Sequence, residues 1–522
     1  AFVGGGALNT GSGIASVAGG GCSNTASGDC SFTGGGLSNT SSGLSSVVGG
    51  GQGNTSAGVG AVVGGGQGNT AAGNCNVVVG GQINRTITGR NAFVGGGCFN
   101  TASGDYSTLG GGRELSANAI YGTVAGGCVN VVAGAASTIV GGLSNLTIGT
   151  CTFIGGGKAN KACYDYDTVV GGDTNCAVGY YGFIGGGLKN CSSSCYGNIV
   201  GGLCNTQAGY SSFIGGGFRN TICNGSSCAG FFIGAGRQNC MRSCYYYNSI
   251  VGGLSNTMTE MASGAFIGSG EFSHSNHANT FIGAGYGLSA LAPYGGIAAG
   301  YESAVCAGGC GFIGGGACNV THNNYATIAG GCGNTIRTSG IGGSIGGGQS
   351  NIVCQDHATV AGGRNNCASN DCTFIGGGYD NCTTNTLDAI VGGLNNTTSG
   401  GCTFIGGGED NNAVACLAVI PGGYQNRADG ECGFIGGGGV NCAVGGASGV
   451  IAGFTNKACA VNSVVVGGCK NTIKNTHSQA ITLGTGINTV SANMVHVNSL
   501  FFVLSDLPTS DPGVDGVIWN SS

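Results

Sequence analysis

The chain has 522 residues, of which 118 are glycine and 4 are proline, and only 7% are charged although 41% are hydrophobic. Disordered chains combine low hydrophobicity with high charge, and collagen needs glycine at every third residue, so this composition excludes both classes. The formal net charge of −5 offers no basic surface for nucleic acid and no polybasic membrane anchor, and no apolar run approaches the roughly 18 to 20 residues of a membrane span.

An asparagine recurs every fifteen residues through most of the chain, two residues after a glycine cluster. Leu115 takes its place once, and Ser273, Leu288 and Ser303 do so in a middle region, about residues 221–318, where the spacing is irregular. Such a fixed period is the signature of a repeat architecture. The most regular members of this asparagine ladder are Asn9, Asn24, Asn39, Asn54, Asn69, Asn84, Asn160, Asn175, Asn190, Asn205, Asn220, Asn366, Asn381, Asn396, Asn411, Asn426, Asn441, Asn456 and Asn471.

Each repeat consists of a short apolar strand, a glycine cluster, two variable residues, the asparagine and a polar turn. Glycine disfavours helix by about 1 kcal/mol per residue relative to alanine, whereas short β-branched or aromatic runs between turn residues are typical of strands. About 32 such repeats predict an all-β fold, a parallel β-solenoid (β-roll or β-helix) over residues 1–488, followed by a distinct end segment, 489–522. Because asparagine tolerates left-handed backbone, the ladder is expected at a repeated corner.

A thirty-residue alternation lies on top of the fifteen-residue repeat, because units with phenylalanine alternate with units such as TVVGG. Either one coil has fifteen residues and bulky turns alternate with small ones, or one coil has thirty residues and two unlike walls. Phe232 and Phe281 break the alternation while the ladder continues, which favours fifteen. The two coils predict shafts of about 150 Å and about 75 Å at normal strand spacing. The expected core aromatics are Phe153, Phe183, Phe213, Phe374, Phe404 and Phe434.

The 29 cysteines indicate an oxidised, extracellular framework, and their odd number leaves at least one free or paired between chains. Small, reduced fillers of the turns are the alternative, and opposed Cys-x-x-Cys pairs for a metal are not apparent. Cys372, Cys402 and Cys432 recur every thirty residues and are expected to stack. The pairs that could close one loop are Cys191 with Cys195, Cys240 with Cys244, Cys306 with Cys310, and Cys367 with Cys372.

Catalysis is not expected. The glycine clusters recur in every repeat, and none continues into the Gly-Lys-Ser/Thr of a phosphate-binding loop. No cofactor or metal is expected either. A recognition surface is sought in the irregular middle, where Cys223 to Cys228, Tyr245 to Tyr247 and Glu271 to His277 interrupt the repeat, because insertions in solenoids form loops. Imperfect repeats without a function are the alternative.

Units such as GGGCFNTASGDYSTLGGG, from Gly95, resemble the arrays in tail-fibre and fibre-like proteins of bacteriophages, particularly marine ones. More distantly, they are similar to the heads of trimeric autotransporter adhesins, which are β-rolls. The run LPTSDPGVDGVIWN at 507–520 resembles a segment frequent near the C-termini of phage structural proteins, where a further strand usually follows. Because the repeat is already under way at residue 1, we expect an anchoring part to precede it.

This resemblance implies a virion fibre shaft, homotrimeric and extracellular, that joins other virion or tail proteins and reaches a receptor or glycan on the host surface. A surface adhesin or filament of a bacterial cell is the second hypothesis. An ice- or mineral-binding solenoid is a third, because threonine follows the asparagine at Thr10, Thr25, Thr40, Thr55 and Thr70, although Thr-x-Thr rows are absent.

Overall fold

The computed structural model describes residues 1–223, 229–243, 245–259, 261–337, 339 and 341–498. Within them every regular element is a β-strand, and the strands form two parallel sheets wound as a β-solenoid of about 32 turns of roughly fifteen residues. The predicted all-β solenoid is therefore confirmed. The chain divides into two compact units, Ala1–Ala290 and Leu291–Ser522.

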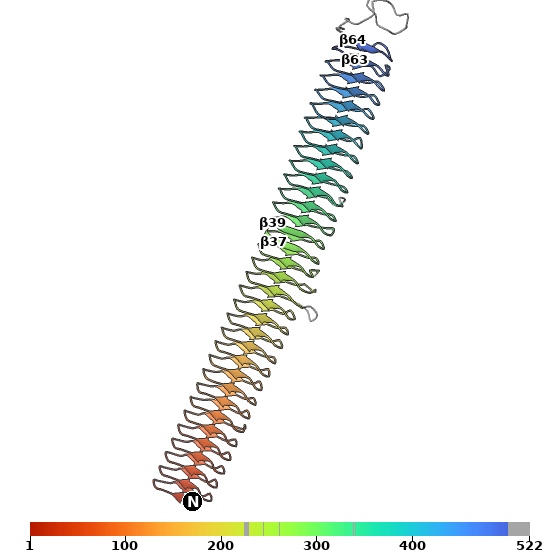
Figure 1. The fold of residues 1–522 in the computed structure, drawn as a ribbon. Coiled ribbons are helices and arrows are strands. Elements are labelled where there is room, and N and C mark those ends of the chain that lie inside the picture. Colours follow the sequence, from red (N-terminus) through yellow and green to blue (C-terminus); the bar gives the residue numbers. More distant parts are fainter. Residues whose placement is uncertain (224–228, 244, 260, 338, 340, 499–522) are drawn as a thin grey trace, which may run out of the picture. The chain divides into compact units, whose positions relative to one another are not determined.

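Both units contain the same two sheets. In the first unit, the odd-numbered strands from β1 (Phe2–Val3) to β37 (Phe281–Tyr286) form sheet A, and the even-numbered strands from β2 (Thr10–Gly11) to β38 (Ser289–Ala290) form sheet B. In the second unit, sheet A consists of the odd-numbered strands from β39 (Gly296–Tyr301) to β63 (Ile481–Leu483) and of β64 (Val495–Val497), and sheet B runs from β40 (Ala304–Val305) to β62 (Thr472–Ile473). Most strands have two residues, whereas β37 and β39, labelled in Figure 1, have six.

One turn of the solenoid contains fifteen residues. In sheet A, β21 (Phe153–Ile154) pairs in parallel with β23 (Thr168–Val169), and Phe153 lies opposite Thr168. The same step relates the strands of sheet B, and within each unit the strands lie one above the next (Figure 1). The fifteen-residue coil is therefore confirmed, and the thirty-residue alternation must come from something other than the length of the coil.

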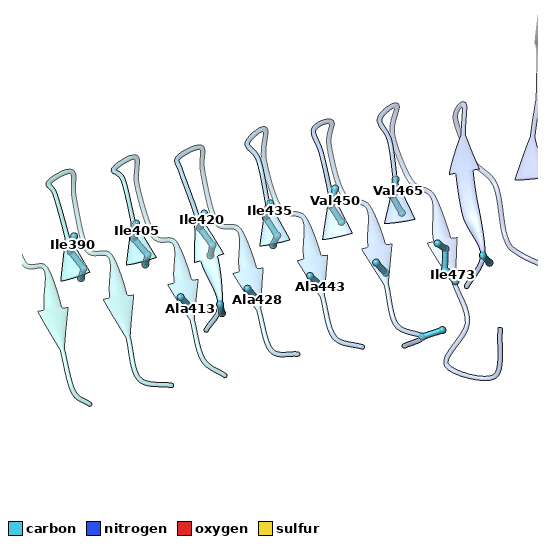
Figure 2. Packing of buried hydrophobic residues seen from close by; sticks show 14 residues of the cluster. Ile390, Ile405, Ala413, Ile420, Ala428, Ile435, Ala443, Val450, Val465 and Ile473 are labelled. Atoms are coloured by element: carbon cyan, nitrogen blue, oxygen red, sulfur yellow. The ribbon is translucent and has the colours of Figure 1, made fainter. Parts of the chain in front are cut away.

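The core is a thin layer between the sheets. The second residue of each two-residue strand points inward, so Ile420 and Ile435 of sheet A lie over Ala428 and Ala443 of sheet B (Figure 2). All four side chains are fully buried. A large residue on one sheet and alanine on the other fill a narrow interior without strain, which is how a turn with so few residues reaches close packing.

The third glycine of each cluster is required by the backbone. Gly157 has a φ of 87°, and a Cβ there would lie 2.1 Å from the carbonyl oxygen of Gly172 in the next turn. Ala159, directly before Asn160, is also left-handed, with a φ of 53°. The left-handed conformation predicted for the asparagine thus belongs to its neighbours, which turn the chain so that the asparagine side chain can point inward.

The asparagine ladder is a continuous array of buried amides. The N–H of Asn160 donates to Oδ1 of Asn145 at 2.9 Å, and Nδ2 of Asn160 donates to the carbonyl oxygens of Gly156 and Gly172, both at 2.9 Å. Asn160 is fully buried, as are its neighbours in the ladder. Each amide therefore accepts from the backbone N–H of the next ladder asparagine and donates to two carbonyls of successive turns, which joins the glycine corners along the solenoid.

The irregular middle leaves the sheets of the first unit intact. Phe232 pairs with Phe213, nineteen residues earlier, and Ser249 and Phe266 follow at steps of seventeen. The extra residues enter the loop that leads from sheet B to sheet A. At the other end, β64 pairs with β63, so strand pairing continues into the predicted end segment as far as Val497. The run at 507–520 lies outside the described residues.

Candidate functional site

The phenylalanines expected in the core lie on the outer face of sheet A instead. Phe153 is 37% exposed and Phe374 41%, whereas the following residues, Ile154 and Ile375, are fully buried. Phe404 and Phe434 are exposed too, and Phe183 and Phe213 are half-buried. The expected core aromatics are thus wrong in orientation. In a two-residue strand one side chain points in and the other out, and the thin core has room only for the smaller one.

Each outward phenylalanine lies beside the glycine two positions later. A Cβ on Gly155 would come within 3.5 Å of the Phe153 ring, and one on Gly376 within 3.4 Å of the Phe374 ring. In the next turn the small Thr168 takes the phenylalanine position, and Val170 takes the glycine position, where it is 48% exposed. Phenylalanine and valine thus share the outer face in alternate turns, and this sharing is the physical origin of the thirty-residue period.

These outward side chains form what we call the apolar strip of each unit. In the first unit the strip includes Phe153, Val170, Phe183, Val200 and Phe213, and in the second unit Phe374, Val391, Phe404, Phe434 and Ile451. No strand of sheet A described here begins with a charged residue, whereas strands of sheet B begin with Arg85, Lys161, Arg427 and Lys457. The outer face of sheet B therefore carries charged side chains that favour contact with water. The apolar strip on sheet A has the composition of a protein–protein interface.

The threonines noted in the sequence form a single row on sheet B. Thr25 lies opposite Thr40, and Thr55 opposite Thr70, so the hydroxyl-bearing side chains follow one another at strand spacing. The row ends where Arg85 takes the next position.

The expected loop-closing disulfides are wrong for the described cysteines, all of which are free thiols. Cys367 lies at the start of β48 (Cys367–Ala368) in sheet B, whereas Cys372 occupies an exposed left-handed loop position with a φ of 56°. Cys191 and Cys195, and Cys306 and Cys310, are likewise unbonded. Cys240 is free, and its candidate partner Cys244 lies outside the described residues.

Cys372, Cys402 and Cys432 do not stack on one another. Each lies two turns from the next, at about 10 Å by strand spacing, and Leu387 and Leu417 occupy the turns between them. All five are exposed loop residues of the second unit with positive φ. Their thirty-residue spacing follows the phenylalanine–valine alternation and brings no two of these thiols together.

A stack of tyrosines in the first unit was not predicted. The rings of Tyr166, Tyr181 and Tyr196 lie parallel in successive turns, with centroids 4.7 and 4.9 Å apart. Each ring is more than 40% exposed. The signal was present as tyrosines exactly one repeat apart, and it was missed because that loop position holds many residue types elsewhere in the chain.

The irregular middle contains surface hollows. Arg242, Thr259, Met261 and Asn276 line one hollow, in which the Thr259 hydroxyl donates to the Asn276 amide oxygen at 2.6 Å. Met261, Tyr245 and His277 line a second, adjoining hollow. Tyr247 is 74% exposed, and His274 is half-buried in β36 (His274–Ser275), where burial lowers its pKa. Of the predicted segment from Cys223 to Cys228, only Cys223 lies within the described residues.

Neither a metal centre nor a membrane span is found in the described part of the chain. No three histidine, cysteine, aspartate or glutamate side chains gather there in a way that could hold a metal ion. The same residues contain no helix long and apolar enough to cross a membrane. In comparisons with protein-family models and with curated proteins, no match to this chain was found.

Proposed function

We propose that this chain forms the repetitive shaft of a virion fibre, and that the shaft is a homotrimer that holds a host-attachment end away from the particle. The apolar strip carries this proposal. Exposed phenylalanines and valines follow one another through successive turns of each unit, and a face of this composition is costly to leave in water. The proposed role is mechanical and needs no catalysis.

A second copy of the chain is the partner that best fits the strip. The pattern of phenylalanine and valine repeats every two turns, which is about 10 Å along the solenoid axis. A partner must match that spacing over many turns. A second copy in parallel orientation has the same spacing because it has the same sequence. The resemblance to trimeric fibres and adhesin heads supports three copies in place of two.

The resemblance of the repeats and of the run at 507–520 to phage proteins supports a virion over a cell envelope. Within such a fibre, other tail or virion proteins would hold one end, and a host receptor or glycan would be bound at the other end or at loops. The adjoining hollows around Met261 are the described surface best suited to such binding, because arginine, tyrosine and methionine side chains converge there.

Immunogold electron microscopy tests the location. Antibodies against the purified chain should label thin fibres on virus particles released from the source culture. Labelling confined to the envelope of intact cells would contradict the proposal and would favour the bacterial adhesin. The preimmune serum from the same animals is the matched control.

A further inference from the structure

Two groups of three cysteines, one in each unit, have the same arrangement on the outer face of sheet B. In the first unit, Cys176 of β24 (Cys176–Ala177) lies opposite Cys191 of β26 (Cys191–Ser192). In the second unit, Cys367 of β48 lies opposite Cys382 of β50 (Cys382–Thr383). Among the strand pairs of the described residues, cysteine lies opposite cysteine only at these two places.

A third thiol adjoins each pair from the preceding turn. Lys161 lies opposite Cys176, and Cys163 follows Lys161 by two residues on the same side of the sheet. Cys354 has the same relation to Cys367, because Ile352 lies opposite Cys367. The middle cysteine of each group thus has one thiol directly above it and another diagonally below it.

The middle cysteine of each group is the one suited to react. The Cys163 and Cys191 thiols donate to the Cys176 sulfur and lower its pKa, whereas the same hydrogen bonds, followed by burial and the Cys176 charge, raise the pKa of the other two thiols. In the second unit, hydrogen bonds from Cys354 and Cys382 lower the pKa of Cys367, whose sulfur also lies 3.0 Å from the Ser369 hydroxyl. A thiolate is the nucleophile in thiol–disulfide exchange, and all six side chains are half-buried, within reach of a small reagent.

The distance between Cα atoms decides which thiol can form a disulfide with the middle cysteine. Directly opposed residues of neighbouring parallel strands have Cα atoms about 4.8 Å apart, within the roughly 4.4 to 6.8 Å of natural disulfides. Cys163 is displaced from that position by two residues, about 6.6 Å along the strand, so its Cα lies about 8 Å from that of Cys176. This distance exceeds the limit of about 7 Å for a disulfide.

We propose that Cys176 with Cys191, and Cys367 with Cys382, are thiol–disulfide exchange sites that a small-molecule disulfide converts into crosslinks between successive turns. The Cys176 thiolate attacks one sulfur of the reagent and forms a mixed disulfide, which releases one small thiol. The Cys191 thiol then loses its proton, attacks the Cys176 sulfur and expels the second small thiol. Two protein thiols lose two electrons and two protons in total, and the reagent gains both.

Peptide mapping of the full chain after treatment with oxidised glutathione tests the proposal. Free thiols are alkylated, the chain is unfolded and then digested with trypsin, which cleaves after Lys161, Lys189 and Arg219. A Cys176–Cys191 bond joins peptides 162–189 and 190–219, whereas Cys163–Cys176 and Cys191–Cys195 bonds each stay within one peptide. In the second unit, chymotryptic cleavage after Phe374 and Tyr379 separates Cys382 from Cys367 and Cys372.

We expect the joined peptides in both units, with Cys163 and Cys354 alkylated. C191S should remove the first crosslink and leave one glutathione on Cys176, whereas C195S, the matched control, should keep the crosslink. Circular dichroism checks that both variants fold. Bonds within a loop, a Cys163–Cys176 bond, or free thiols at all these positions after treatment would overturn the proposal.

Discussion

A ladder asparagine contributes three hydrogen bonds from a fully buried side chain, so its loss is not local to one turn. The amide nitrogen of Asn160 donates to the carbonyl oxygens of Gly156 and Gly172, and its amide oxygen accepts from the N–H of Asn175. Leu115 occupies one ladder position and is fully buried. The array therefore tolerates a missing amide, and a single substitution is expected to weaken the fold without preventing it.

Asn160→Ala should destabilise its own turn and the next one. It leaves the Gly156 carbonyl and the N–H of the fully buried Asn175 without partners, at a cost of about 1 to 3 kcal/mol each before relaxation, whereas the Gly172 carbonyl keeps its hydrogen bond from the N–H of Lys158. Because turns of a solenoid interact mainly with their neighbours, hydrogen exchange followed by mass spectrometry should show faster exchange around residues 145–176 and little change in distant turns.

The matched control for this variant is Lys161→Ala, which changes the neighbouring outward side chain of β22 (Lys161–Ala162) and leaves the ladder intact. Equal exchange in Asn160→Ala and Lys161→Ala would show that the ladder amides add nothing to stability.

Asp167 gives the first unit a pH-dependent element. The side chain is fully buried and accepts hydrogen bonds from the backbone N–H groups of Tyr164 and Gly182, both at 2.8 Å. Burial raises the pKa of this carboxyl from about 3.9 in an unfolded chain to about 6. The hydrogen bonds lower the pKa, but burial has the larger effect. The folded state thus binds the proton more tightly. Its stability is greatest when the carboxyl is protonated and falls as pH rises from about 4 to about 6.

Asp167→Asn should remove this part of the pH dependence. Asn248 occupies the same position in its turn, where its Oδ1 accepts from the N–H of Ala265 and its Nδ2 donates to the Ala262 carbonyl, both at 2.9 Å, so an amide fits there. We expect the thermal midpoint of the wild type to drop between pH 4 and pH 6 more than that of Asp167→Asn. The exposed Glu431→Gln is the control, and identical pH profiles for wild type and Asp167→Asn would contradict the account.

At the scale of one element, a two-residue strand has one inward and one outward side chain, and the outward side of sheet A is the proposed contact between chains. Phe153→Ser, Phe183→Ser and Phe213→Ser combined should leave the fold intact, because the inward isoleucines remain. Each phenylalanine lost from an interface costs roughly 1 kcal/mol or more per chain, so the assembly should weaken by several orders of magnitude.

Light scattering coupled to gel filtration measures this change. We expect about 150 kDa for the wild-type chain, three times its mass of 50.3 kDa, and a single-chain mass for the triple variant. Val131→Ser with Leu146→Ser is the matched control, since both residues point outward from sheet B. A triple variant that keeps the wild-type mass would exclude the strip as the contact.

The length of one turn could be predicted from the sequence, whereas the direction of a side chain and the pairing of two cysteines could not. The Asn160-to-Asn175 spacing is the length of one turn, and it could be preferred to the thirty-residue period because the ladder continues where Phe232 and Phe281 break the alternation. The direction of Phe153 could not be predicted, because Phe153 and Ile154 are both apolar and a two-residue strand has no alternation to read. The pairing of Cys176 with Cys191 needed the strand register, and proximity in sequence favoured Cys195 instead.

At the scale of the whole molecule, the proposed fibre combines fifteen-residue solenoid turns with assembly of the chains through the apolar strip. One turn of fifteen residues weighs about 1.4 kDa and rises about 4.8 Å, so one chain corresponds to roughly 3 kDa per nanometre of shaft. Three parallel chains correspond to roughly 9 kDa per nanometre.

Scanning transmission electron microscopy of unstained particles of the purified chain measures the mass per unit length. This quantity depends both on the rise of one turn and on the number of parallel chains. We expect elongated particles of roughly 9 kDa per nanometre. Roughly 3 kDa per nanometre would show that the solenoid stands alone and that the strip does not join chains, and particles that are not elongated would contradict the shaft itself.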